Sequence, residues 1–392
     1  MNICVFSTHF GGGYGTGYSI RKEIAEFEKS GHNIFVIHSE KNISPYQIKG
    51  VEYFYSKISK IPLLNILLLK REIKSAIGQI IKNNRIDIFY IQSLEFGSCI
   101  GEIAGTAPIV YFARSTIRGI ETNKPKEYWL DDLRRKLITP ILIYLEKRCL
   151  RMSNLIIVKS SLIKDELTQL YRINDKKIKI VPGGIDNADF PKMSKEEKNK
   201  IRKAMNLPLN KKILLYSGRI VPVKGLYYLV KSLNELIAGR DDIVLIVAGK
   251  SMQSQYFKVI ENMIRSHRLE QHVVFAGYVP QHLMFRYYGI CDIVVLPSTY
   301  EPFGMTAIQA IIMGKPLIIT NRVGAVENIK EYPLLKVVPA HDSKSLTYAI
   351  ASLLDLKING EANKFDLSKL YWNNMALELQ RLFIGLIQNR KR

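Results

Sequence analysis

Residues 213–225 read ILLYSGRIVPVKG, an apolar run followed by a glycine-flanked turn that carries Arg219 and Lys224. Such a run is typical of a strand that is buried on both faces of a parallel sheet. Open α/β sheets bind ligands at the carboxyl ends of their strands, which is where these two cations stand. An arginine can grip a diphosphate with its planar fork, and a lysine can act as a point charge. A pair of solvated surface cations is the alternative, but it does not explain the flanking glycines.

Apolar runs of the same kind recur through the chain and alternate with stretches of helical period. The expected strands are residues 2–7, 33–38, 86–91, 108–112, 155–158 and 179–181, and then 213–217, 243–248, 273–276, 293–296 and 316–320. Two such series indicate an α/β protein with two domains, each built on a parallel sheet. We expect one domain over residues 1–190 and a second over 191–369, with the turn-rich residues 181–186 near the boundary. A long amphipathic helix over 370–392 could pack on either domain, including back on the first.

The composition is that of an ordinary globular protein, with 47% apolar and 23% charged residues over 392 positions. No apolar run approaches the roughly 18 residues of a spanning helix. Residues 2–6 read as a strand and not as a secretion signal. The four cysteines form no C-x-x-C pair, so neither a zinc site nor a disulfide framework is indicated. We therefore expect a cytoplasmic protein whose cysteines are buried as small apolar residues.

The chain carries 57 lysine and arginine residues against 35 aspartate and glutamate residues, a net charge of +22 at pH 7. A field of this sign attracts polyanions such as nucleic acid, anionic lipid or phosphorylated substrates. Nucleic acid is disfavoured as a partner because no reader motif and no long basic tail is present. Residues 134–151 alternate basic clusters with an apolar stretch, as in a helix that lies on an anionic membrane surface. A core helix with solvated charged ends explains the same pattern and is the favoured interpretation.

The first expected strand leads into a glycine-rich loop, residues 8–17, which read THFGGGYGTG, and a helix follows. Glycines let a backbone approach a ligand closely, and the N–H groups at a helix start favour anions. The loop is not a dinucleotide fingerprint, because no register gives G-x-G-x-x-G, and no Gly-Lys-Ser/Thr closes a P-loop. A flexible turn would account for two glycines but hardly for five in seven positions. We therefore expect this loop to contact an anionic or polyhydroxy ligand.

Two further motifs follow later strands. Residues 297–310 read PSTYEPFGMTAIQA, in which Gly304 opens a helix whose N–H groups can hold a phosphate. Glu301 precedes this helix and Gln309 lies inside it, so one could reach sugar hydroxyls and the other a ribose. Residues 314–327 read GKPLIITNRVGAVE, a strand that leads into another loop of small residues and a helix.

Together these motifs resemble, in order and spacing, the retaining glycosyltransferases of family 4. That family has the GT-B fold, in which two Rossmann-like domains with parallel sheets face each other across a cleft. The resemblance covers nearly the whole chain, from the glycine-rich first loop through the turn at residues 181–186 to the closing helix. Each motif is weak alone, whereas Glu301 in combination with the upstream Arg219 and Lys224 is specific.

The resemblance implies a catalytic group of Arg219, Lys224 and Glu301. The two cations would hold the diphosphate of a nucleotide sugar and offset charge on the leaving group, while Glu301 would bond hydroxyls of the donor sugar. The backbone at 303–306 would cradle phosphate, and residues 277–279 lie where the family contacts the base. The expected donor-binding residues are Gly12, Gly13, Arg219, Lys224, Tyr278, Val279, Glu301, Phe303, Gly304, Met305, Thr306 and Gln309. The candidates on the acceptor side are Gly13, Tyr14 and Arg114.

Two positions depart from the family pattern. The family usually has a second glutamate where this chain has Gln309, and it commonly has a histidine where this chain has Arg114. An amide can still donate and accept at a ribose, although a charged acceptor is lost. A cation at position 114 could assist a charged donor or acceptor, but the role of the histidine is not carried over.

The chain has no D-x-D triplet and no evident cluster of metal ligands, so we expect transfer without a metal or another cofactor. Cations and helix N-termini would then stabilise the leaving diphosphate. The resemblance implies retention of the anomeric configuration, and family frequency favours a UDP-sugar as the donor. The acceptor stays open between a glycan, a lipid-linked saccharide and a small sugar-like molecule. A peripheral position on the inner face of the membrane would suit a lipid-linked acceptor.

The main alternative is a non-catalytic partner subunit that binds a glycan or an active homologue, and it draws support from Gln309 and Arg114. The intact Arg219, Lys224 and Glu301 count against it, because drift would damage a charged donor site first. An isomerase or phosphorylase on the same fold is disfavoured because no cofactor-anchoring motif stands out.

Overall fold

The chain forms two compact units. The computed structural model describes residues 1–10, 15–56, 62–123, 133–186, 190–191, 193–251, 254–354, 356 and 365–391. The first unit comprises Met1–Gly119, Leu130–Gly184 and Leu367–Arg392, and the second comprises Ile120–Trp129 and Ile185–Asp366. The chain passes from the first unit to the second a few residues before the expected boundary at 190/191. The assignment of a short segment after Gly119 to the second unit was not suggested by the sequence.

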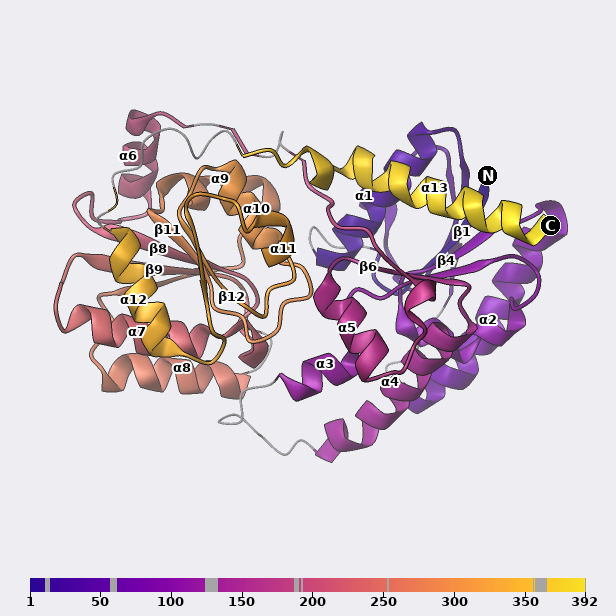
Figure 1. Cartoon of the computed structure of the whole chain (residues 1–392), viewed down its shortest axis with the longest axis horizontal. Coiled ribbons are helices and arrows are strands. Elements are labelled where there is room, and N and C mark those ends of the chain that lie inside the picture. The colour runs from indigo at the N-terminus through magenta and orange to yellow at the C-terminus, as the bar shows by residue number, and fades with distance from the viewer. Residues whose placement is uncertain are drawn as a thin grey trace. The chain divides into compact units, whose positions relative to one another are not determined.

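The first unit is built on a seven-stranded parallel sheet in the order β3-β2-β1-β4-β5-β6-β7, with helices packed against it (Figure 1). Its strands are β1 (Asn2–Ser7), β2 (Asn33–His38), β3 (Val51–Tyr55), β4 (Ile88–Ile91), β5 (Ile109–Phe112), β6 (Leu155–Val158) and β7 (Ile178–Ile180). Its helices are α1 (Gly15–Lys29), α2 (Pro62–Asn83), α4 (Leu133–Met152), α5 (Ser161–Gln169) and α13 (Trp372–Lys391), and α3 (Ile117–Thr122) begins in this unit and ends in the second. The strand order reverses between β1 and β4, where Ile3 of β1 lies between Ile34 and Ile88.

The second unit is built on a six-stranded parallel sheet in the order β10-β9-β8-β11-β12-β13. Its strands are β8 (Lys212–Ser217), β9 (Ile243–Ala248), β10 (Val273–Gly277), β11 (Ile293–Leu296), β12 (Leu317–Thr320) and β13 (Leu335–Val338). Its helices are α6 (Lys195–Ala204), α7 (Leu226–Ile237), α8 (Ser254–Ser266), α9 (Gln281–Ile290), α10 (Met305–Ile312), α11 (Val326–Ile329) and α12 (Ser343–Leu354). The two parallel sheets confirm the expected fold class.

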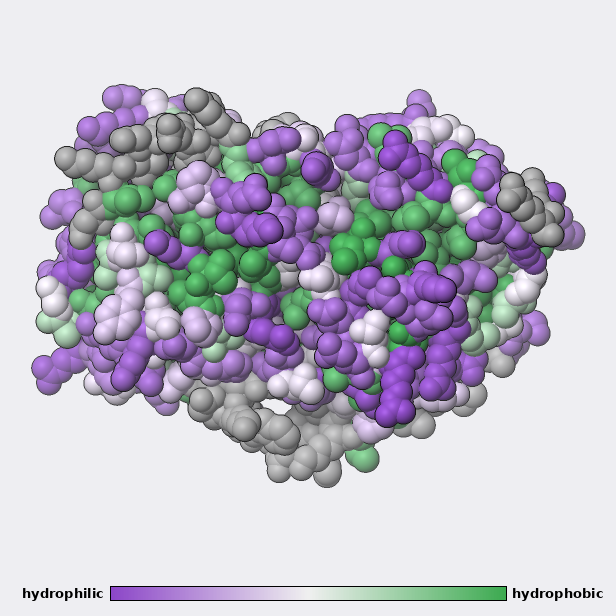
Figure 2. Space-filling view, viewed as in Figure 1, coloured by the Kyte–Doolittle hydropathy of each residue, from purple (hydrophilic) through white to green (hydrophobic). Residues whose placement is uncertain are grey.

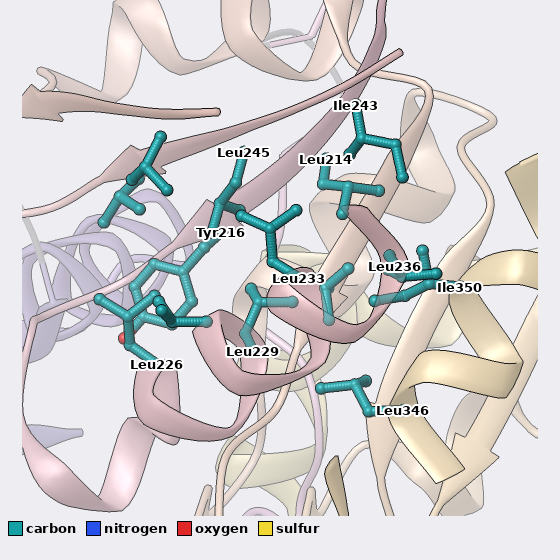
Figure 3. Packing of buried hydrophobic residues seen from close by; sticks show 14 of the residues in the cluster. Leu214, Tyr216, Leu226, Leu229, Leu233, Leu236, Ile243, Leu245, Leu346 and Ile350 are labelled. Atoms are coloured by element: carbon teal, nitrogen blue, oxygen red, sulfur yellow. The ribbon is translucent and has the colours of Figure 1, made fainter. Parts of the chain in front are cut away.

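The core of the second unit is a layer of aliphatic side chains between its sheet and α7 (Figure 3). The buried stripe of α7 has helical spacing and consists of Leu226, Leu229, Leu233 and Leu236. It packs on residues of β8 and β9, including Leu214 and Leu245, and on Leu346 and Ile350 of α12. Burial of each such side chain contributes roughly 1.5–3 kcal/mol. The start of α7 is thereby fixed just after the turn that carries Arg219 and Lys224.

The last helix, α13, belongs to the first unit. Its buried side chains Trp372, Met375, Leu379 and Phe383 join the same apolar cluster as Phe27 of α1. The rings of Phe27 and Phe383 lie 5.8 Å apart. Of the two placements that the amphipathic pattern left open, the structure has the one on the first sheet.

Both sheets contain one strand that the sequence pattern did not indicate. These are β3 and β13, and each lies at an edge of its sheet. Their residues are largely half-buried or exposed, so they lack the continuous apolar run of the interior strands. The glycine-rich loop was expected to extend to Gly17, but α1 begins at Gly15, so the last two of the five glycines lie in the first turn of the helix.

The four cysteines are free and buried, as expected from their spacing. They are distributed over both units: Cys4 lies in β1, Cys149 in α4, and Cys99 and Cys291 lie in connecting segments. Burial raises the pKa of each thiol above its usual value. These side chains therefore serve as small apolar core residues.

The last turns of α4 agree with the interpretation of residues 134–151 as a core helix. The second half is core, with Leu145, Cys149 and Leu150 buried. Earlier in the helix, Leu137 is 67% exposed and Tyr144 is 57% exposed. Among the described residues, no helix is both long and apolar enough to cross a bilayer. Figure 2 shows one face of the molecule, where hydrophilic side chains cover most of the surface and hydrophobic ones lie in separate groups between them.

Glu146 of α4 caps the start of the short helix α3. Its carboxylate accepts from the backbone N–H of Ile117, 3.1 Å from Oε2, and from the hydroxyl of Tyr171. The same Tyr171 oxygen accepts from the N–H of Arg118 at 3.1 Å. Burial raises the pKa of Glu146 to about 7, although these hydrogen bonds oppose the shift. The folded chain therefore holds a proton on Glu146 that the unfolded chain releases at lower pH.

We expect the free energy of unfolding of the first unit to fall as pH rises from about 4.5 to 7, because the folded state binds this extra proton. The contribution of Glu146 is about 3 kcal/mol over that range. Glu146→Gln should remove this component, and exposed Glu270→Gln should not. Urea unfolding at several pH values, followed by tryptophan fluorescence, measures it because Trp372 is buried in this unit. An unchanged pH slope in Glu146→Gln would contradict the assignment.

Candidate active site

The second sheet has its topological switch point between β8 and β11. Segments that leave neighbouring strands in opposite directions open a crevice at such a point, and ligands bind there. Arg219 and Lys224 follow β8, and Glu301 follows β11. The structure therefore brings the three expected catalytic residues to the carboxyl edge of one sheet.

Lys224 and Glu301 form an ion pair between Nζ and Oε2. Their side chains are only 15% and 16% exposed, so the pair is shielded from most of the solvent. The backbone holds it in place, because the N–H of Thr299 donates to the carbonyl of Val223 at 2.9 Å. Gly225 follows at φ +70°, and a Cβ atom there would lie 1.9 Å from the carbonyl oxygen of Pro297. Only glycine fits at this crossing of the two loops.

The segment after β12 braces Glu301 from its other side. The N–H of Glu301 donates to the carbonyl of Arg322 at 3.0 Å, and the N–H of Gly324 donates to the carbonyl of Glu301 at 2.9 Å. The N–H of Ala325 donates to the carbonyl of Phe303 at 2.6 Å. The third sequence motif, residues 314–327, thus has a definite place: it fixes the backbone on which Glu301 stands.

Helix α10 points its N-terminus toward this edge of the sheet. Gly304 caps it at φ +103°, and the hydroxyl of Thr306 donates to the carbonyl of Ser217 at the end of β8, at 3.1 Å. Phe303 is buried and Met305 is half-buried. The N–H groups and dipole at such a helix start favour a phosphate. The expected phosphate cradle at 303–306 therefore lies beside the strand end that leads to Arg219.

A groove of about 520 Å³ opens next to Arg219 and is lined by Ile220, Gly249, Lys250, Ser251, Phe257, Phe275, Gly277 and Tyr278. Arg219 itself is exposed, and its carbonyl accepts from the hydroxyl of Tyr216 at 2.8 Å. Gly249 allows the loops after β8 and β9 to touch, since a Cβ atom there would lie 1.8 Å from the carbonyl oxygen of Gly218. Val279 is half-buried just after Tyr278. Phe257, Phe275 and Tyr278 give the groove aromatic walls, and Lys250 is the cation in its lining.

Unlike Arg219 and Tyr278, Gln309 is not exposed. Its side chain is buried, and its Oε1 accepts from the hydroxyl of Tyr288 at 2.8 Å. The amide at this position thus takes part in the packing of α10 against α9. A carboxylate at the same place would also accept from Tyr288, so the substitution preserves this internal contact.

In the first unit, the candidates Gly12, Gly13 and Tyr14 lie outside the described residues. Arg114 follows β5 and is held by protein partners. Its Nη2 lies 2.8 Å from Oε1 of Glu23, and its Nε and Nη2 donate to Oε1 of Gln92 at 3.1 and 2.7 Å. The structure thus gives this arginine an internal network, which the sequence did not indicate.

Known families match almost the whole length of the chain. Glycosyltransferase Family 4 matches residues 14–189, and Glycosyl transferases group 1 matches residues 197–366. The chain belongs to the family 4 glycosyltransferases. This glycosyltransferase has the GT-B fold, as the two parallel sheets and the solved structures that it resembles show.

The similar proteins span several activities. The glycosyltransferase is 28% identical over 235 residues to an uncharacterized glycosyltransferase of Methanocaldococcus jannaschii, covering 58% of this chain and 59% of the relative. It is 25% identical over 332 residues to alpha-monoglucosyldiacylglycerol synthase of Streptococcus pneumoniae, covering 81% and 70%. Its structure matches that of Anabaena HepE in complex with UDP-glucose, with a TM-score of 0.70, 17% identity and coverage of 99% and 98%. The chain spans 39–59% of the length of the curated relatives that it matches first.

Sequence reasoning missed the polar residues that interact with Arg114 in the first unit of this glycosyltransferase. Glu23 has the spacing of the apolar stripe of α1, three positions after Ile20 and four before Phe27, but its charge gave no reason to place it in the core, and nothing marked Gln92. Lys159 follows β6 and was not distinguished from other lysines, yet burial and the nearby Arg114 lower its pKa to about 7. Its Nζ donates to the carbonyl of Gly183 at 2.8 Å. Gln92 and Lys159 each come directly after an apolar strand. This change from apolar to polar sequence at a strand end is the signal that could have indicated them.

Gly225→Ala should destabilise the second unit by roughly 2–4 kcal/mol, because the Cβ atom would meet a backbone oxygen and the φ angle is strained. The matched control is Gly218→Ala, where a Cβ atom would find only the Tyr216 hydroxyl, at 3.9 Å. Urea unfolding of both variants measures the difference. Equal stability of the two variants would show that the Gly225 crossing is not needed.

Proposed function

We propose that this glycosyltransferase moves a sugar from a UDP-sugar to a hydroxyl of a glycan or lipid-linked acceptor, with retention of configuration and without a metal. The observation that carries the proposal is the shielded Lys224–Glu301 pair at the switch point, beside Arg219 and the N-terminus of α10. These groups form one site for an anionic leaving group and a polyhydroxy sugar.

The diphosphate would lie between Arg219, Lys224 and the start of α10. Two cations and a helix dipole can neutralise a leaving diphosphate in a partly dry site, where electrostatic interactions are stronger than in bulk water. This supplies the charge stabilisation for which other glycosyltransferases use a divalent ion. The proposal of a metal-independent reaction rests on this set of groups.

The sugar and the nucleoside would lie on either side of the diphosphate. Glu301 pairs with Lys224 through Oε2, so Oε1 is the oxygen with which it would accept from sugar hydroxyls. The groove with Phe275 and Tyr278 would take the base, whose flat face suits aromatic walls. Gln309 would reach a ribose through its amide nitrogen, since its oxygen accepts from Tyr288. Uridine is favoured as the base by family frequency, and HepE was crystallised with UDP-glucose.

We propose retention because the resemblance to the retaining glycosyltransferases of family 4 implies it, and the site does not suggest a double displacement. Glu301 is paired with a lysine and not with a second carboxylate, as a glycosidase-like double displacement would require. In the proposed step the bond between the anomeric carbon and the diphosphate oxygen breaks. The acceptor oxygen bonds to the same face of that carbon, and its proton passes to the departing diphosphate.

A panel of UDP-, GDP-, ADP- and dTDP-sugars in EDTA tests the donor proposal. We expect one UDP-sugar to raise the melting temperature by mass action and to be turned over with the chelator present. Lys224→Ala and Glu301→Ala should each lower turnover by about 100-fold or more, the usual scale for a lost electrostatic contact. Lys231→Ala, an exposed lysine on α7, is the matched control and should keep turnover.

Three outcomes would overturn parts of this proposal. Stabilisation by a different nucleotide sugar would replace UDP as the donor base. Turnover that EDTA abolishes and added metal restores would remove the metal-independent step. If none of the donors binds at millimolar concentration, the assignment of the β8–β11 edge as a donor site is wrong.

We propose that the enzyme meets a lipid-linked acceptor at an anionic membrane surface, on the cytoplasmic side. Helix α4 supports this, because Leu137 and Tyr144 are exposed on it and Lys147 and Arg151 follow in the same helix. An amphipathic helix with basic residues binds anionic interfaces in this way. The similarity to a synthase named for a glucosylated diacylglycerol points to the same acceptor class.

Co-sedimentation with vesicles tests this placement. We expect the enzyme to bind phosphatidylglycerol-containing vesicles, to bind neutral vesicles less, and to be partly released by high salt. The double variant Leu137→Ser/Tyr144→Ser should reduce binding by about 10-fold, since two exposed apolar groups are lost. Tyr348→Ser removes an exposed tyrosine of the second unit and should leave binding unchanged. Equal binding by all three proteins would exclude α4 as the contact.

A further inference from the structure

A buried ionic network joins α1 to the ends of β4 and β5 in the first unit. Arg114 uses two of its nitrogens for Glu23 and Gln92, as described above. The remaining oxygen of Glu23 accepts from the hydroxyl of Tyr90 at 3.1 Å and from Nε2 of Gln92 at 2.8 Å. Glu23 is 1% exposed, so its negative charge depends on protein partners alone.

The network makes α1 dependent on one arginine. A carboxylate that is removed from water is tolerated when it is both hydrogen-bonded and paired with a cation. Arg114 supplies the ion pair to Glu23 at 2.8 Å. If that cation were lost, Glu23 would have to take up a proton or turn toward water, and α1 would shift with it.

We propose that Arg114 is a positioning residue of the reaction: by pairing with Glu23 it fixes α1 against the sheet, and so fixes the start of the helix that follows the glycine-rich loop. The inference rests on the proposed role of that loop at the donor. It assigns Arg114 to the interior of the first unit and not to direct contact with the acceptor.

The surroundings of Arg114 support this role over a substrate contact. Its guanidinium lies over the ring of Phe112 at 4.4 Å, and its side chain is 16% exposed. Its Nε and Nη2 are committed to side-chain oxygens at 2.7–3.1 Å. An arginine that binds a substrate anion in a bidentate way needs two neighbouring N–H groups for that anion.

The neighbouring titratable groups determine how loss of Arg114 should depend on pH. Lys159 is the other buried cation beside Glu23, and repulsion by Arg114 helps to lower its pKa. Burial and Glu23 hold the pKa of Tyr90 well above its usual value, so this hydroxyl stays neutral. Without Arg114, Lys159 is the cation that remains beside Glu23, so the deprotonation of Lys159 as pH rises would disrupt the network.

The test compares Arg114→Gln, Glu23→Gln and the double variant. We expect Arg114→Gln to lower kcat by about 10- to 100-fold at pH 8, with a smaller loss at pH 6, and to leave KM for the donor within about 2-fold. The double variant Glu23→Gln/Arg114→Gln removes both charges. It should recover kcat to within about 5-fold of the wild type and should lose the added pH dependence.

Two kinetic outcomes would overturn the inference. A double variant as impaired as Arg114→Gln at every pH would show that Arg114 contacts the substrate directly. An Arg114→Gln variant with normal kcat from pH 6 to 8 would show that the pair does not position the reaction. If Arg114→Gln does not fold, Arg114→Lys takes its place; it should lower kcat without the new pH dependence, because the charge beside Glu23 is kept.

A measurement that does not depend on turnover tests this inference independently of the proposed donor and acceptor. Amide hydrogen exchange in α1 should be faster in Arg114→Gln at pH 8 and should return toward the wild-type rate in the double variant. The matched control is Arg202→Gln, which breaks the 3.1 Å pair with Asp292 in the second unit. It should leave exchange in α1 and the pH profile unchanged. Unchanged exchange in Arg114→Gln would overturn the inference even if every donor failed to bind.

Discussion

The proposed donor site of this glycosyltransferase depends on the crossing of two loops at Gly225. The loop after β8 carries Lys224, and the loop after β11 carries Glu301; the two meet because the Thr299 N–H binds the Val223 carbonyl. Glycine at the crossing lets the loops touch, and the ion pair forms on top of that contact. The segment after β12 then holds Glu301 from its other side. Three neighbouring strand ends are therefore joined through backbone hydrogen bonds before any substrate arrives.

This arrangement explains how much of the site the sequence could predict. Arg219, Lys224, Glu301 and the start of α10 lie within short motifs that directly follow apolar runs, and parallel strands bring such positions to one edge. The contacts that those residues make with the rest of the protein could not be predicted from the sequence. Nothing local shows that Gly324 and the backbone of Arg322 hold Glu301, or that Gln309 turns inward to Tyr288, because these contacts depend on how separate strands pair and how helices pack.

The same limit applies more strongly in the first unit. The interior strands were predictable because a strand buried on both faces must be apolar throughout, whereas the edge strands β3 and β13 carry mixed sequences. Glu23 is a charged residue within the apolar stripe of α1, three positions after Ile20 and four before Phe27, and it is buried. Its partners lie more than 60 residues away in the chain, so only the folded sheet reveals the pairing.

The position of α13 has a consequence for the order in which the protein is made. Trp372, Met375, Leu379 and Phe383 complete the core of the first unit, and the Gly184 N–H binds the Leu370 carbonyl next to them. These residues are synthesised after every strand of the second unit. During translation, the first unit therefore keeps an apolar face exposed until the second unit has been synthesised. The core of the first unit can therefore close only after the last helix has been synthesised.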